Sequence, residues 1–125
     1  MGLTIAKKSY LDLRVLECGN LFLFLEDFSL VLSDGRAWVV PKGFVFDATS
    51  SRIGKIYIGQ FGPWIWAAAI HDLLYTVRGC SRREADKVMY DILKASGVRY
   101  WLRKLMYKVV RLFGHNSWNK PAPKK

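Results

Sequence analysis

The sequence predicts an α+β fold, in which a small N-terminal antiparallel β-sheet is followed by three C-terminal helices, the first two forming an antiparallel hairpin. Short apolar runs separated by turn-forming residues fill residues 11–46, whereas residues 63–113 show helical periodicity interrupted near residues 79–80 and 97. A chain of 125 residues is long enough for one hydrophobic core. We therefore predict a single domain over residues 1–114 and a flexible basic tail over residues 115–125.

Five strands are expected from the apolar runs of the N-terminal part. They cover residues 11–16, 21–25, 28–32, 37–40 and 44–46. The Ser-Asp-Gly-Arg segment at residues 33–36 predicts a hairpin turn in which Gly35 has a positive φ. The connection that follows, residues 47–62, is rich in glycine and polar residues. Long connections of this kind are often functional.

Three helices are expected after this connection. The first covers residues 63–77, with Pro63 in its first turn. The second begins after Ser81, which forms a capping box with Glu84, and it ends at Gly97. The third covers residues 98–113, where basic side chains alternate with apolar ones.

The positive charge is concentrated in the C-terminal part. The chain has a formal net charge of +10, and residues 51–125 contain fifteen Lys and Arg against four Asp and Glu. This asymmetry indicates an anionic partner, which is phospholipid headgroups, nucleic acid or an acidic protein surface. No apolar run approaches the roughly 20 residues that a transmembrane helix needs, so no transmembrane segment is expected.

Four polar residues lie within the otherwise apolar helical hairpin. His71 and Tyr75 share one face of the first helix, Asp72 is turned from them by about 100°, and Asp86 lies in the second helix. Along the paired helices, His71 and Asp86 differ in position by only about 4 to 5 Å. We expect Asp86 to accept hydrogen bonds from one nitrogen of His71 and from the Tyr75 hydroxyl, leaving the other nitrogen free.

This arrangement has the chemistry of a hydrolytic site. A neutral imidazole that a buried carboxylate orients is a general base for water. Asp72 is placed to ligate a hard cation such as Ca²⁺, which would polarise an ester carbonyl, with further oxygens from Asp47, Gly59 and Gly62. The alternative is a buried hydrogen-bond network that only fixes helix packing, with Asp47 as a turn former and both glycines as turn residues.

The Ala-Ala-x-x-His-Asp-x-x-Tyr pattern of residues 67–75, followed by Asp86, resembles the catalytic helix pair of the phospholipase A-two superfamily, especially its disulfide-free version in parvoviral capsid proteins. The resemblance implies that His71 is the base, that Asp72 binds Ca²⁺, and that Tyr75 and Asp86 form the supporting network. The Gly-rich calcium loop of that superfamily has no counterpart within residues 52–63.

Residues 41–113 also resemble an uncharacterised family of tailed phages and prophages, domain of unknown function 1353. The matching residues are Pro41, Lys42, Gly43, Phe44, Asp47, Ser50, Ala68, Ala69, His71, Asp72, Tyr75, Arg82 or Arg83, Ala85 and Asp86. A Ser-Arg pair at residues 51–52 replaces the usual Ile-Pro. The resemblance implies a phage protein made in the host cytoplasm, with the virion as a further location, and it brings no established activity.

Two functions follow as hypotheses. The first is a Ca²⁺-dependent lipid ester hydrolase whose basic third helix attracts anionic lipid. The second is a non-enzymatic virion or assembly protein, of the tail or connector, whose basic half binds other virion proteins, an acidic partner or nucleic acid. In the third helix, Trp101 and Tyr107 among the cations favour an interfacial membrane helix, and the alternative is a core-facing helix with a solvated basic back.

Overall fold

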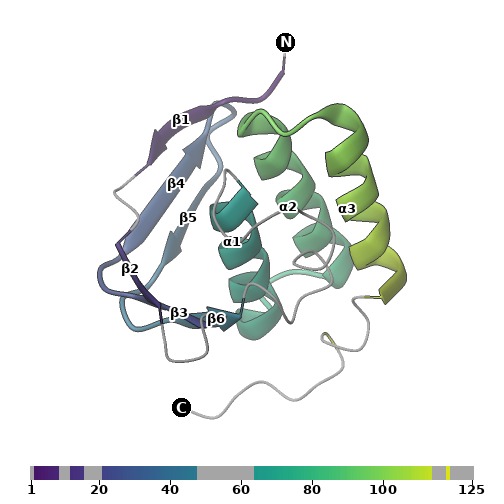
Figure 1. Ribbon diagram of the computed structural model, residues 1–125. Coiled ribbons are helices and arrows are strands. Elements are labelled where there is room, and N and C mark those ends of the chain that lie inside the picture. The colour runs from purple at the N-terminus through teal and green to yellow at the C-terminus, as the bar shows by residue number, and fades with distance from the viewer. Residues whose placement is uncertain (1, 9–11, 16–20, 48–63, 114–117, 119–125) are drawn as a thin grey trace.

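Strands precede helices in the fold, as the sequence predicts (Figure 1). The computed structural model describes residues 2–8, 12–15, 21–47, 64–113 and 118. The strands are β1 (Ile5–Lys8), β2 (Leu13–Val15), β3 (Leu21–Phe24), β4 (Phe28–Leu32), β5 (Ala37–Val40) and β6 (Val45–Asp47). The helices are α1 (Trp64–Val77), α2 (Arg82–Ala95) and α3 (Tyr100–Phe113). The predicted α+β class is confirmed.

The strands form two three-stranded antiparallel sheets where the sequence suggests one. The first sheet has the order β1-β4-β5 and the second has the order β2-β3-β6. The chain passes between the sheets three times, and two of these passages, β3 to β4 and β5 to β6, lie at one corner. There the backbone N–H of Lys42 donates to the Asp27 carboxylate at 2.7 Å, and that of Gly43 donates to the Phe24 carbonyl at 2.8 Å. Strand β1 is not predicted from the sequence, because only Ile5 in it is even half-buried and no apolar run marks it.

The local signals at turns and helix ends are confirmed. Gly35 has φ +94° in the turn between β4 and β5, and the N–H of Leu32 donates to the carbonyl of Arg36 at 2.9 Å. Ser81 and Glu84 form the predicted capping box of α2. Gly97, with φ +85°, follows the end of that helix. Helix α3 begins at Tyr100, two residues later than the sequence suggests.

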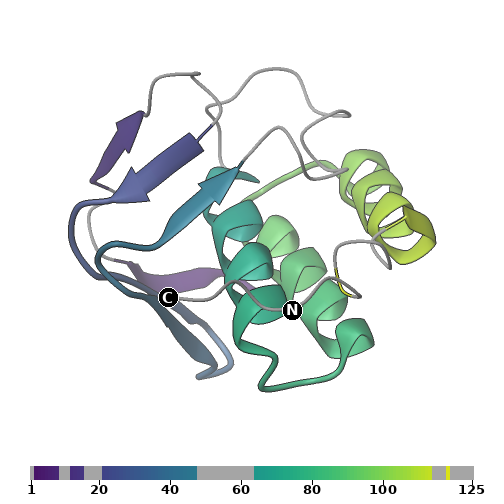
Figure 2. The ribbon, with the colours of Figure 1, turned by 90° about the horizontal axis from the view of Figure 1, so that it is seen from below.

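Helix α1 lies between the strands and α2, and α3 packs on the far side of α2 (Figures 1 and 2). Residues 67–70 of α1 are three alanines and an isoleucine. All four are buried, and the small alanines let α1 approach its neighbours closely. Phe22 stacks on Phe46 with ring centroids 5.4 Å apart, and Phe24 packs at a tilt against Phe46 with centroids 5.6 Å apart. Among the described residues, no helix is long and apolar enough to cross a lipid bilayer.

A charged network joins the β4–β5 turn to α2. Asp91 on α2 is almost fully buried, and its carboxylate accepts from Arg36 Nη2 at 2.9 Å and from Lys87 Nζ at 3.0 Å. Arg36 also donates from Nε to Asp34 at 2.8 Å. Because an unpaired buried carboxylate is costly, Arg36 holds the first sheet against the helices.

We expect Arg36→Met to lower the free energy of unfolding by about 1–3 kcal/mol, because it leaves Asp91 with Lys87 alone. The value lies below that of a fully buried pair because Arg36 is partly exposed. Urea unfolding measures it. Arg83→Met, which removes the same charge from an exposed position on α2, should stay within about 0.5 kcal/mol of wild type. Equal losses in both variants would show that the network does not hold the sheet.

Candidate functional site

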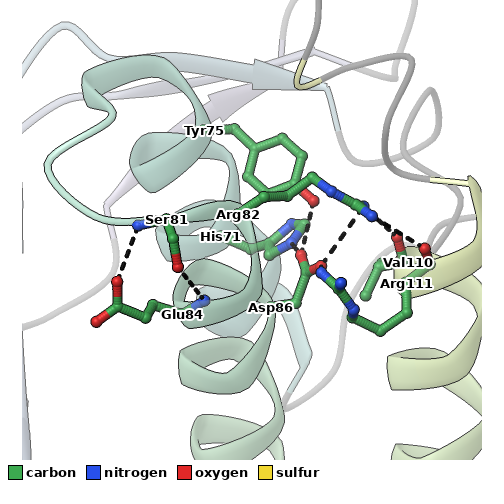
Figure 3. Close-up of polar contacts among 8 residues, drawn as sticks. All are labelled: His71, Tyr75, Ser81, Arg82, Glu84, Asp86, Val110 and Arg111. Carbon is green, nitrogen blue, oxygen red and sulfur yellow. Dashed lines mark hydrogen bonds and ion pairs between the residues drawn. The ribbon is translucent and has the colours of Figure 1, made fainter.

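The predicted His71, Tyr75 and Asp86 network is present between α1 and α2 (Figure 3). Nε2 of His71 lies 2.7 Å from Oδ1 of Asp86, and the Tyr75 hydroxyl donates to the same oxygen at 2.6 Å. Asp86 is fully buried, and the other two side chains are nearly so. The rings of His71 and Tyr75 pack against each other with centroids 4.4 Å apart. Helical spacing thus brings these three residues together as expected.

Two arginines complete the surroundings of Asp86 on its other oxygen. Nη1 of Arg111, on α3, donates to Oδ2 at 2.8 Å, and Nη1 of Arg82 lies 3.7 Å from it (Figure 3). The guanidinium of Arg82 also donates to the backbone carbonyls of Val110 and Arg111, each at 3.1 Å. Those carbonyls lie in the last turn of α3, where a cation is favourable. The carboxylate therefore connects all three helices.

These contacts fix the charge of Asp86 and the tautomer of His71. Burial raises the pKa of Asp86, but the hydrogen bonds from His71, Tyr75 and Arg111 together lower it by more. The pKa of Asp86 therefore lies below the ordinary value of 3.8. Burial, followed by the bond to Asp86, raises the pKa of Tyr75, which stays a neutral donor. An ionised carboxylate only accepts, so Nε2 of His71 carries the hydrogen. In the neutral ring, Nδ1 is then the basic nitrogen.

The structure describes only part of the predicted calcium site. Asp72 is half-buried on α1, and its backbone carbonyl accepts from the Thr76 hydroxyl at 2.9 Å. Asp47 is the last residue of β6, and its backbone pairs with Leu21 of β3. Gly59 and Gly62 lie outside the described residues. Among the residues that are described, no group of three or more His, Cys, Asp or Glu is placed to hold a metal ion.

A groove of about 640 Å³ lies beside α1, and His71 is not among the residues that line it. Leu74 and Val77 line it, opposite Trp38 of β5. Cys80 also lines it, but burial and nearby carboxylates raise the pKa of its thiol, so it stays protonated. This groove is therefore separate from the imidazole, and the raised pKa of the Cys80 thiol disfavours the thiolate that a cysteine nucleophile needs.

Sequence reasoning missed the role of both arginines and of Trp118. Arg82 precedes Asp86 by four residues, a spacing that indicates a helical ion pair, and the structure selects it over its neighbour Arg83. Arg111 is twenty-five residues from Asp86, so no local pattern indicates their contact. Trp118 packs edge-on against Tyr75 with ring centroids 5.1 Å apart. The flexibility of residues 115–125 stays a prediction.

Comparison with protein families matches most of this chain to a known family. The model of a family described as a protein of unknown function, DUF1353, matches residues 22–110. Because this match covers well over half of the chain, the protein belongs to that family. The match spans β3 to α3 and so includes the whole His71, Tyr75 and Asp86 network. Searches of curated proteins and of solved structures gave no significant match.

We expect Asp86→Asn to lower the free energy of unfolding at pH 7 by about 2–4 kcal/mol, because it removes the charge that Arg111 and Arg82 surround. A carboxylate with a lowered folded-state pKa stabilises the fold above the unfolded value of 3.8, and its contribution is lost as the pH falls below that value. Urea unfolding between pH 7 and pH 3 should therefore show a smaller loss of stability for the variant than for wild type.

The exposed carboxylate of Glu26 provides the matched control. Glu26→Gln should keep the wild-type dependence of stability on pH. If Asp86→Asn keeps it as well, the ionised form of Asp86 is not what stabilises the fold.

Proposed function

We propose that the protein is a phage- or prophage-encoded hydrolase of lipid esters in which His71 is the general base. The observation that carries the proposal is the orientation of His71: its Nε2 donates to a buried, ionised Asp86, which leaves Nδ1 to take a proton from water. The motif resemblance of residues 67–86 to the phospholipase A-two superfamily supports the reaction class. The resemblance of residues 41–113 to a phage family supports the origin.

In this proposal the chain's own residues have separate tasks. His71 removes a proton from water as the water attacks the ester carbonyl, and it returns the proton to the leaving alcohol. Asp86 holds the ring in one tautomer and stabilises the imidazolium that forms. Tyr75 donates to the same carboxylate oxygen and packs against the imidazole, so it restricts rotation of the ring. Tyr75 and Asp86 are thus positioning residues.

Calcium dependence is a separate part of the proposal. A bound Ca²⁺ would supply positive charge to an ester carbonyl, and it prefers six to eight oxygen ligands. Asp72 is the proposed carboxylate ligand, with Asp47, Gly59 and Gly62 as the other candidates. Among the described residues, no three His, Cys, Asp or Glu side chains lie together to hold an ion. The proposed roles of His71 and Asp86 do not depend on the ion.

The proposal predicts that the protein releases fatty acid from phospholipid. His71→Asn should lower the rate of this hydrolysis at least about 100-fold. The substrates are a short-chain phospholipid below its micellar concentration, which needs no membrane binding, and phosphatidylglycerol vesicles. Each is measured with Ca²⁺ and with a chelator. Asp72→Asn should remove any response to Ca²⁺ while His71 stays in place.

The other histidine of the chain, His115, provides a matched control for His71→Asn, because it lies outside the motif. His115→Asn should keep the wild-type rate. Thermal melts of both variants separate loss of catalysis from loss of the fold. Equal background rates for wild type, His71→Asn and His115→Asn on both substrates would overturn the enzymatic proposal.

A second candidate function is that of a non-enzymatic virion or assembly protein. The observation that favours it is that the Asp86 carboxylate accepts from α1 and from α3 at once, which is what a network that only fixes helix packing would do. In this case the basic C-terminal half binds another virion protein or nucleic acid.

This candidate predicts that the chain is a component of purified phage particles and that Tyr75→Phe lowers stability and particle yield together. Removing the hydroxyl leaves Asp86 with one donor fewer, a cost of about 1–2 kcal/mol. Mass spectrometry of particles measures incorporation, and thermal melts measure stability. Absence of the chain from the particles would exclude the structural role.

A further inference from the structure

Helix α3 presents a second apolar surface that no described element covers. Helix α3 lies at the edge of the helical layer farthest from the strands (Figures 1 and 2). Met106 and Val110 point inward and are buried, whereas Trp101, Leu105 and Leu112 are 62%, 41% and 58% exposed. These three residues share one helix face with residue 108, because positions 101, 105, 108 and 112 are spaced by four, three and four.

We call residues Trp101, Leu105, Lys108 and Leu112 the outer seam. Its charge is positive only, because Lys104 lies at its edge, Lys108 lies within it, and α3 contains no Asp or Glu. The seam belongs to a shallow groove of about 590 Å³. The lining residues of this groove are Trp101, Lys104, Leu105, Tyr107, Lys108, Arg111 and Leu112.

We propose that the outer seam is the surface by which this protein docks on an anionic lipid bilayer. A helix that lies flat at the bilayer surface needs large apolar side chains that enter the headgroup and acyl boundary and cations that reach lipid phosphates. Trp101, Leu105 and Leu112 meet the first need, and Lys104 and Lys108 meet the second. The long lysine side chains reach the phosphates while their apolar stems lie along the seam.

Other occupants fit this surface less well. In a second copy of the chain, the seam would bring lysine against lysine with no carboxylate on either helix. Nucleic acid would satisfy the lysines but would leave Leu105 and Leu112 without an apolar partner. A bilayer satisfies both kinds of side chain, and it adapts to the surface of a single helix without a complementary shape.

The docking surface and the proposed catalytic site are distinct parts of the fold. His71 lies on α1, and the outer seam lies on the far side of α3. Arg111 connects them, since it lines the groove and donates to Asp86. Membrane docking needs no catalysis, so the test can use His71→Asn as well as wild type, and failure of one proposal leaves the other intact.

The test is cosedimentation of the full chain with vesicles of phosphatidylcholine alone or mixed with phosphatidylglycerol. We expect binding to the mixed vesicles, weakened by salt, and little binding to phosphatidylcholine. Lys104→Glu with Lys108→Glu should weaken binding on the order of thirtyfold or more, because each basic residue near an anionic surface contributes about 1 kcal/mol. Replacing Trp101, Leu105 and Leu112 by alanine should weaken binding at least about tenfold at unchanged charge.

Two control variants match these changes elsewhere on the molecule. Lys7→Glu with Lys42→Glu changes the net charge equally at exposed positions on the strand side, and Val77→Ala removes an apolar group that is 65% exposed. Both should bind as wild type does. Equal weakening in the charge control would overturn the proposal in favour of nonspecific attraction, and no binding to either vesicle would overturn it outright.

A competition assay separates lipid from nucleic acid. Vesicles containing phosphatidylglycerol and duplex DNA, at equal phosphate concentration, compete for binding of the protein. The proposal expects the vesicles to retain the protein. Displacement by DNA, with DNA binding unaffected by the three alanine replacements, would overturn the lipid assignment in favour of a nucleic-acid surface.

Discussion

A single buried charge, the carboxylate of Asp86, constrains the position of all three helices. An ion at zero exposure is tolerated only when donors surround it closely, because removing it from water costs several kcal/mol. One carboxylate oxygen takes both of its donors from α1, and the other faces Arg111 of α3 and Arg82 of α2. Neither α1 nor α3 can slide along α2 without taking donors away from the buried carboxylate.

The same constraint determines what His71 can do. Because Asp86 stays ionised, the imidazole is held with Nε2 as donor and with its ring packed on Tyr75. A packing network and a general base both need this rigidity, so the network by itself does not distinguish them. The distinction depends on the surroundings of Nδ1 and on what Asp72 binds, which is why the reaction must be measured on variants of His71 and Asp72 separately.

The features that the sequence predicted correctly depend on local spacing. The capping box of Ser81, the turn at Gly35 and the approach of His71 and Tyr75 to Asp86 all follow from periodicity or from residues on either side of one turn. Two of the contacts that it missed join distant residues: Arg36 and Asp91 are separated by fifty-five positions, and Arg111 and Asp86 by twenty-five. A pair so far apart has no fixed spacing, because its geometry is set by how whole elements pack.

The division of strands into two sheets has the same origin. The apolar runs of β3 and β4 carry no pattern that assigns them to different sheets, and phenylalanines of β3, β4 and β6 pack against one another across both sheets. The proposed calcium ligands Asp47, Gly59 and Gly62 have a different basis, since residue types and a motif resemblance suggested them and no periodicity places them. Their assignment stays a prediction.

Helix α3 shows why an amphipathic pattern alone does not assign a surface. Its sequence contains apolar residues at nearly every turn, and the pattern does not separate Met106 and Val110, which face α2, from Leu105 and Leu112, which face outward. A helix with one apolar face removes it from water by packing that face on the core. A helix with two apolar faces leaves the second one in water until a partner covers it. In this chain the inner face is fixed through Arg111 to the Asp86 carboxylate, so α3 cannot turn to bury the outer one. The exposure of the outer seam is therefore a consequence of the network that holds the helices together. The anionic lipid bilayer that we propose would cover it.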